Sequence, residues 1–141
     1  MLTIWSGDVR FSPLRWVLGA FLLALLLGHA TPSQAQDNRP LVFHNNCNAP
    51  VRLLVYHAED PRRWQVNGFY TIGPNGRSTL QVRGESITHI TGHALFYYAE
   101  LPNGRTFGTV ERNVPHRGAN YAMSRATVTV QNGNNVFAVR C

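Results

Sequence analysis

Residues 47–76 read CNAPVRLLVYHAEDPRRWQVNGFYTIGPNG, and they carry the strongest β-strand and turn signals in the chain. Its first apolar run, residues 51–56, is apolar at both parities apart from one arginine, which is typical of a central strand of a sandwich. Residues 59–61 are a turn sequence, because Asp accepts local backbone hydrogen bonds and Pro fixes φ. β character returns at residues 68–72, and the Pro-Asn-Gly at 74–76 suits a second turn with positive φ. The stretch predicts a β-hairpin-like unit on which the rest of the chain packs.

Alternating apolar residues before and after this unit predict further strands. Leu41, Phe43, Asn45 and Cys47 share one parity, so a first strand beginning at Leu41 would put two hydrophobic side chains and the cysteine on one side. At the other end of the chain one strand face carries Phe137, Val139 and Cys141. Because the apolar parity matches a cysteine at both ends, we expect the first and last strands to lie close together.

The other strands are predicted from period-two alternation between Gly, Pro and Asn turns. They cover residues 78–82, 94–99, 105–110 and 121–130, with 105–110 as the hairpin partner of 94–99. Residues 113–118 predict a loop, because they contain a proline, and residues 84–92 are ambiguous. About seven to nine short strands without a helical period predict an all-β fold, an antiparallel β-sandwich or a jelly-roll-like barrel.

Short motifs in the same region also resemble a known family. A Cys-Asn pair precedes an apolar strand, a Trp, a Gly-aromatic-aromatic step, an Ile-x-Pro-x-Gly-like turn and a later Tyr-Tyr strand. The matching positions are Cys47, Asn48, Val51, Val55, Trp64, Gly68, Phe69, Tyr70, Ile72, Pro74, Tyr97 and Tyr98. On these positions the chain from Leu41 to its end resembles the bacterial secreted family called domain of unknown function 1036. The resemblance implies a secreted β-domain and assigns no site.

The first 35 residues have the pattern of a secretory leader. Arg10 and Arg15 precede an apolar run at 16–28, and the small residues at 33–35 follow. This order predicts a helical signal peptide cleaved after residue 35. The alternative, a membrane anchor, needs roughly 20 apolar residues, and this run is shorter.

The domain organisation and destination follow from this leader. We expect a signal peptide at 1–35, a flexible tether at 36–40 and a single β-sandwich domain at 41–141, with no transmembrane segment in the mature chain. The predicted destination is secreted or periplasmic.

Only two cysteines occur in the chain, Cys47 and Cys141. In an exported protein two cysteines most simply form a disulfide. Closing so long a loop would stabilise the fold by about 4–5 kcal/mol in the chain-entropy model. The alternative, a reactive thiol with a partner group, is poorly served by a cysteine at the C-terminus.

All 13 basic residues are arginine; they face seven acidic residues, and the formal net charge is +6. Such a chain attracts anions such as envelope phosphates, acidic polysaccharide or nucleic acid, but attraction alone confers no specificity. The arginines are spread along the sequence, which favours an ordinary solvated surface. We expect no specific nucleic-acid binding.

The sequence contains no Gly-x-Ser-x-Gly elbow, no His-Glu-x-x-His and no phosphate-binding glycine loop, so it predicts no catalytic residues and no cofactor. Glu100 and Glu111, considered as paired carboxylates, each lie beside turn or arginine-containing sequence. His89 and His93 are the candidate metal ligands, because four residues apart in an unbroken strand they would share a face. Other histidines that could join them are His44, His57 and His116. Ordinary hydrogen-bonded histidines are the alternative.

An aromatic cluster with basic neighbours is the candidate binding site. Trp64, Phe69 and Tyr70 follow Arg62 and Arg63, and a flat ring beside guanidinium groups is suited to stacking sugars, peptidoglycan fragments or bases. The alternative is that Trp64 closes one end of the core.

Two functions from different classes remain. The preferred hypothesis is a non-enzymatic exported binding module for an envelope component, a glycan or a partner protein. The alternative is a small secreted metal-assisted enzyme that uses His89 and His93. A secreted toxin or antagonist is compatible with the size and charge, and nothing in the sequence tests it.

Overall fold

The chain is described from residue 36 to residue 141 in a computed structural model, and this part contains β-strands and no helix. The predicted all-β class is therefore confirmed, whereas the predicted signal peptide at 1–35 lies outside the described residues. None of the described residues belongs to a helix long and apolar enough to cross a membrane. The strands are β1 (Asn38–Asn46), β2 (Val51–Asp60), β3 (Arg63–Ile72), β4 (Arg77–Thr79), β5 (Gln81–Val82), β6 (Glu85–Ser86), β7 (Thr88–Ile90), β8 (Phe96–Glu100), β9 (Val110–His116), β10 (Ala119–Arg125), β11 (Thr129–Gln131) and β12 (Asn134–Arg140).

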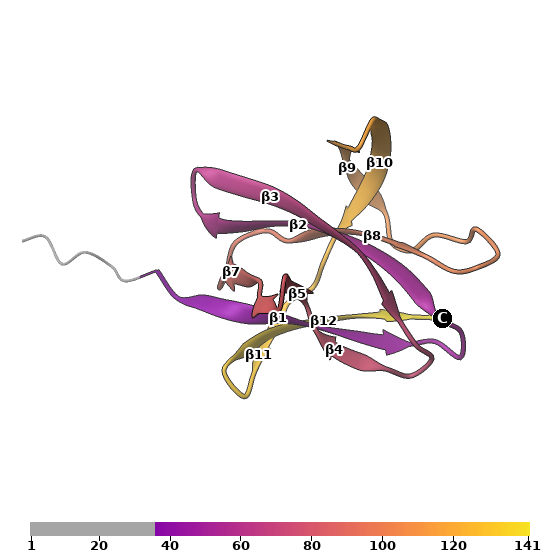
Figure 1. The fold of residues 1–141 in the computed structure, drawn as a ribbon, viewed down its shortest axis with the longest axis horizontal. Coiled ribbons are helices and arrows are strands. Elements are labelled where there is room, and N and C mark those ends of the chain that lie inside the picture. Colours follow the sequence, from indigo (N-terminus) through magenta and orange to yellow (C-terminus); the bar gives the residue numbers. More distant parts are fainter. Residues whose placement is uncertain (1–35) are drawn as a thin grey trace, which may run out of the picture. The chain divides into compact units, whose positions relative to one another are not determined.

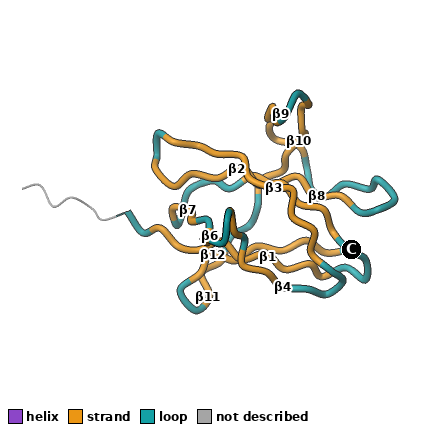
Figure 2. The backbone as a smooth tube through the Cα atoms, in the orientation of Figure 1, coloured by secondary structure: helices purple, strands orange, loops and turns teal. Residues whose placement is uncertain are grey.

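Two five-stranded sheets enclose the main core (Figures 1 and 2). In one sheet the order is β11-β12-β1-β4, and β7 pairs with the start of β1. The other sheet has the order β3-β2-β8-β10-β9 and curls away from the first at β9 and β10 (Figure 1). The predicted hairpin is present as β2 and β3, joined at residues 61–62.

The two ends of the described chain are joined by parallel pairing between β1 and β12. Asn46 lies opposite Arg140, so the next residue of each strand, Cys47 and Cys141, reaches the same point. These two cysteines form a disulfide with Cα atoms 5.1 Å apart, as predicted. The other strand pairs in the two large sheets are antiparallel, and three of them, β2–β3, β9–β10 and β11–β12, are hairpins of consecutive strands.

Side chains of one parity fill the core between the sheets, as the alternation predicts. Phe43 from β1 and Phe137 from β12 pack with ring centroids 5.2 Å apart. Strand β2 contributes Val51, Leu53 and Val55, all 0% exposed. Burial of whole apolar side chains is the main stabilising contribution in such a sandwich.

A buried asparagine holds two segments, the turn after β1 and the end of β3 with its following residue, against this core. Asn45 is 0% exposed, and its Nδ2 donates to the carbonyl oxygens of Ala49, Ile72 and Gly73 at 2.8, 3.0 and 2.8 Å. Its Oδ1 accepts from the backbone N–H of Cys47 at 3.0 Å. Asn45 therefore supplies hydrogen bonds to backbone groups at the end of β3 and in the turn after β1.

The first strand begins earlier than predicted. Residues 38–40, expected to belong to a flexible tether, lie in β1 and pair with residues 88–90 of β7. The ambiguous segment 84–92 supplies this partner, so polar residues with no strand signal of their own are held by backbone pairing.

Three other predictions about strands were wrong. Residues 105–110 do not form a hairpin with 94–99, since β8 lies between β2 and β10 and only one bridge, Glu100 to Thr106, joins these segments. Residues 113–118 are not a loop, because most of them belong to β9, an edge strand, where Pro115 can be accommodated. The segment 121–130 is divided between β10 and β11, which belong to different sheets.

Candidate binding site

The curled sheet has a second apolar face, opposite to the main core. In β2, Leu53 and Val55 face the main core. Leu54 and Tyr56, which alternate with them, face the other way and belong to a second cluster. The buried members of that cluster are Leu54, Phe96, Val114 and Met123. Its ring-bearing members, which we call the aromatic face, are Tyr56, Trp64, Phe69, Phe96, Tyr98 and Tyr121.

The rings of the aromatic face form two groups, and the rings within each group pack against one another. Trp64 lies 4.9 Å from Tyr56 and 6.2 Å from Phe96, centroid to centroid. Tyr121 lies 5.2 Å from Tyr98 and 5.3 Å from Phe69. All but Phe96 are only partly buried, so ring surface is left accessible on this side of the sheet.

Arg112 of β9 joins the first group of rings. Its guanidinium carbon lies 4.8 Å from the ring centroid of Phe96, 5.5 Å from that of Tyr56 and 5.8 Å from that of Trp64. Arg112 is exposed and forms no ion pair within the described part of the chain. The rings hold the guanidinium by cation–π attraction, while its N–H donors stay available to an anion.

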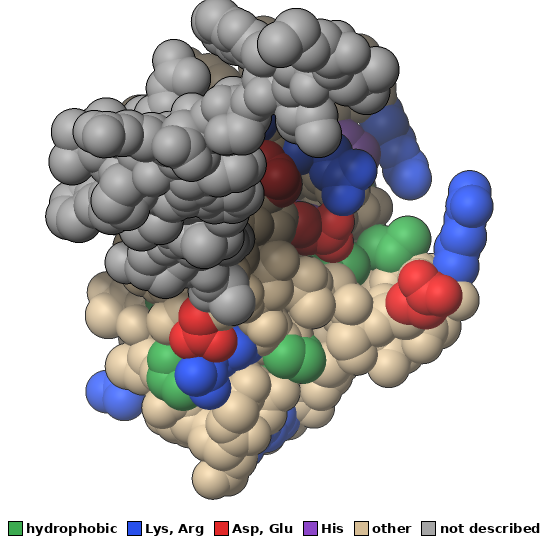
Figure 3. Space-filling model, turned by 90° about the vertical axis from the view of Figure 1, so that its left-hand side faces the viewer, with side chains coloured by type: hydrophobic (Ala, Val, Ile, Leu, Met, Phe, Trp, Pro, Cys, Tyr) green, Lys and Arg blue, Asp and Glu red, His purple; other side chains and the backbone are tan. Residues whose placement is uncertain are grey.

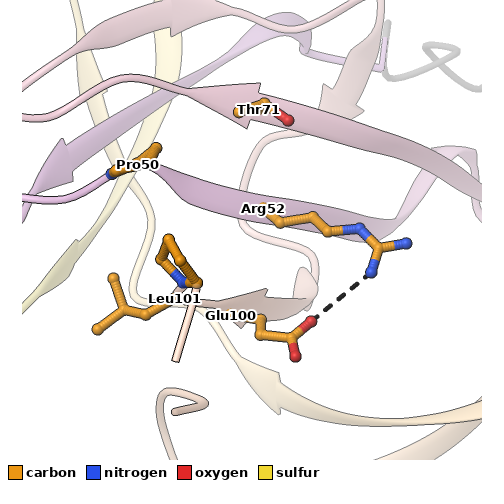
Figure 4. A pocket seen from close by; sticks show the side chains of 6 residues that line it. Pro50, Arg52, Thr71, Glu100 and Leu101 are labelled. Atoms are coloured by element: carbon orange, nitrogen blue, oxygen red, sulfur yellow. Dashed lines mark ion pairs between the residues drawn. The ribbon is translucent and has the colours of Figure 1, made fainter. Parts of the chain in front are cut away.

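Arg52 is held differently, at the other group of rings. Its guanidinium carbon lies 3.6 Å above the Phe69 ring, and Nη1 is 3.7 Å from Oε2 of Glu100. Figure 4 shows Arg52 and Glu100 pointing toward each other across a cavity of about 320 Å³, which Pro50 and Leu101 also line. Glu100 compensates the charge of Arg52, so Arg112 is the more available cation.

The hydroxyl of Tyr98 lies beside this ion pair. Burial first, and Glu100 next, raise the pKa of Tyr98. The phenol therefore stays neutral and keeps its proton as a hydrogen-bond donor at physiological pH.

The structure separates the five predicted binding residues. Trp64 and Phe69 belong to the aromatic face, but Tyr70 packs against the main core and its buried hydroxyl has no hydrogen-bond partner. Arg62 and Arg63 lie exposed at the β2–β3 turn, and neither guanidinium lies over a ring of the described residues. Arg63 instead pairs with Glu59 at 3.5 Å.

A bulge in β3 explains why the side chains of Tyr70 and Trp64 lie on opposite faces of the sheet. Leu53 lies opposite Tyr70 and Leu54 opposite Gly68, so Phe69 has no partner on β2. The extra residue reverses the parity, which sends Phe69 to the aromatic face and Tyr70 to the core. A Cβ at Gly68, where φ is +137°, would lie 2.7 Å from the Leu53 carbonyl oxygen, so this close approach requires glycine.

The two buried histidines are fully hydrogen-bonded. Nδ1 of His89 accepts from the N–H of Ala58 at 3.2 Å, and its Nε2 donates to the His93 carbonyl oxygen at 3.1 Å. Nδ1 of His57 donates to the Thr88 carbonyl oxygen at 2.9 Å, and its Nε2 lies 2.7 Å from Nδ2 of Asn67. Metal binding through His89 would therefore break one of its hydrogen bonds. In residues 36–141 there is no group of three or more His, Cys, Asp or Glu side chains placed to hold a metal ion.

Charges of both signs lie on the surface. On the side that Figure 3 shows, both acidic and basic side chains are visible where grey atoms do not cover the molecule. The ion pairs among the described residues join Arg39 to Asp37, Arg52 to Glu100 and Arg63 to Glu59, and Arg112 belongs to none of them.

Sequence reasoning missed Arg112, and the reason is its strand. Pro115 marks residues 113–118 as a loop, whereas β9 is an edge strand in which Arg112, Val114 and His116 share one parity. That alternation was the available signal. It could not show which distant rings Arg112 would reach.

Comparison with known proteins adds no relative. No protein-family model, no curated protein and no solved structure matches the chain. The resemblance to the family named above stays a prediction, and the function has to be argued from the aromatic face itself.

Proposed function

We propose that this protein is an exported, non-enzymatic binding module and that the aromatic face is its binding site. The observation that carries the proposal is Arg112, an exposed guanidinium held over three rings without a carboxylate partner in the described chain. The disulfide is compatible with an oxidising compartment, which agrees with the signal peptide that the sequence predicts.

The chemistry of the face favours a ligand with both flat apolar surface and negative charge. Tyr56 and Trp64 are partly exposed, and the ring surface that they leave accessible beside Arg112 can pack against a sugar ring. Arg112 offers planar N–H donors that suit a carboxylate. A carboxylate-bearing glycan satisfies both, so we propose an acidic polysaccharide as the ligand.

Trp64 makes the test direct. The other tryptophans, Trp5 and Trp16, lie in residues 1–35, so a Trp64→Phe variant of the full chain gives the fluorescence baseline to subtract. We expect oligogalacturonate to change the emission of Trp64 saturably and to protect it from acrylamide quenching. Neutral cello-oligosaccharide should bind less tightly, and added salt should reduce only the galacturonate affinity.

Three variants distinguish binding at the aromatic face from general electrostatic attraction. Arg112→Gln should weaken galacturonate binding roughly tenfold, about 1.4 kcal/mol. Arg77→Gln, an exposed arginine on β4 of the other sheet, and Tyr70→Phe should bind as the wild type does. An unchanged Trp64 emission with both glycans, or an equal loss in Arg77→Gln, would contradict the proposal.

A further inference from the structure

Strand β3 has one edge that pairs with no other strand of the described chain. This strand spans ten residues and pairs with β2 alone, at the margin of its sheet (Figure 1). In the described part of the chain no other backbone group pairs with its second edge between residues 63 and 71. A long unpaired edge presents N–H and C=O groups to which another extended chain can add.

Two adjoining cavities make this edge a groove. One, of about 450 Å³, is lined by Gln65 and Asn67 of β3 and by the β5–β6 hairpin. The other, of about 430 Å³, continues along residues 66–70 to His116 and Arg117 at the end of β9. Both are lined by Asn67 and Val82, so the groove runs lengthwise beside β3.

The charges along the groove change sign from one end to the other. The first cavity is lined by Glu59 and Glu85 with a single cation, Arg83. The second is lined by His116 and Arg117 and by no acidic residue. Between them lies Val82, an exposed hydrophobic side chain at 40%. An occupant should be basic at the first end, apolar in the middle and acidic at the second.

We propose that this groove binds an extended segment of a partner protein, which adds to β3 as an antiparallel strand. Antiparallel addition puts the N-terminus of the segment beside His116 and Arg117, so its acidic residue comes first and its basic residue last. Pairing extends over residues 63–67 and ends at the Gly68–Phe69 bulge, where the ladder is interrupted. This site uses the main chain of β3 and does not depend on a glycan at the aromatic face.

Two hexapeptides of one composition test the proposal on the ¹⁵N-labelled full chain. The first is acetyl-Glu-Thr-Val-Thr-Val-Arg-amide, and the second exchanges its terminal charges. We expect saturable NMR shift changes at the amides of β3 and of the β5–β6 hairpin, with the first peptide binding roughly fivefold more tightly or better. A version of the first peptide methylated on alternate backbone nitrogens should not bind, because it cannot form the ladder.

A matched pair of variants controls for the fold. Val82 and Val130 are both exposed valines, at 40% and 47%, but only Val82 lines the groove. Val82→Glu should abolish peptide binding without changing the melting temperature, and Val130→Glu should bind as the wild type does.

Four results would overturn the proposal. They are no saturable shift at millimolar peptide, equal or better binding of the charge-exchanged peptide, equal binding of the methylated peptide, and shifts confined to residues outside the groove. A concentration-dependent dimer in analytical ultracentrifugation that Val82→Glu abolishes would assign the groove to a second copy of the chain instead.

Discussion

Single residues decide how segments with no ladder partner are held. Asn45 lies near the end of β1 and donates to three carbonyl oxygens, one at the end of β3 and two in the turns after β1 and β3. Gly68 allows β3 to approach Leu53 closely enough to form the bulge. An apolar period identifies neither residue, because their roles depend on backbone groups far away in the sequence.

The variant Asn45→Ala tests how much this residue contributes to stability. Removal of the amide leaves buried carbonyl oxygens without donors, so we expect the free energy of unfolding to fall by about 2–4 kcal/mol. Asn46→Ala, at the exposed neighbouring position, should change it by less than about 0.5 kcal/mol. Urea unfolding of both variants measures the difference, and an equal effect would refute this role for Asn45.

At the scale of elements, histidines join the two sheets. His57 of β2 donates to a carbonyl oxygen of β7, and His89 of β7 accepts from a backbone N–H of β2. Burial, the largest cause, lowers the pKa of both histidines. Smaller influences act on each in both directions, including the hydrogen bonds to Thr88, His93 and Ala58. Each imidazole is therefore neutral in the folded protein at neutral pH.

This pairing predicts how stability depends on pH. Below the ordinary histidine pKa of 6.5 the unfolded chain binds protons that the folded chain does not, so stability is fully present above 6.5 and falls as the pH drops below it. Two such residues give a slope of up to about 2.7 kcal/mol per pH unit. Urea unfolding between about pH 5 and 8 measures it.

One variant isolates the contribution of His57. His57→Gln should reduce the slope by up to about 1.4 kcal/mol per pH unit, because one buried imidazole is gone. Asn46→Ala, at an exposed position on β1, should keep the slope of the wild type. A stability that is flat across this range in the wild type would show that the two imidazoles accept protons without cost.

In the whole molecule, the described residues 36–141 form one compact unit closed by the Cys47–Cys141 disulfide. The bond lies where the parallel strands β1 and β12 end. The disulfide therefore reduces the conformational entropy of the unfolded chain over nearly the whole unit.

The double variant Cys47→Ala/Cys141→Ala tests this contribution. We expect its free energy of unfolding to be about 4–5 kcal/mol lower than that of the oxidised wild type. Reduction of the wild type should bring its urea midpoint close to that of the variant. Equal midpoints for oxidised wild type and variant would mean that the strand pairing alone holds the two ends together.

Local alternation, turn chemistry and the presence of two cysteines were enough to predict the β class, the β2–β3 hairpin, the core parity and the disulfide. The side that Tyr70 and Phe69 face could not be predicted in this way, since one bulged residue, formed where β3 pairs with β2, reverses a period of two. The tertiary structure also decided that Arg112 reaches Trp64, as curling of the sheet brings an edge strand over rings from β2, β3 and β8. Such contacts depend on pairing between segments distant in sequence, which no local pattern encodes.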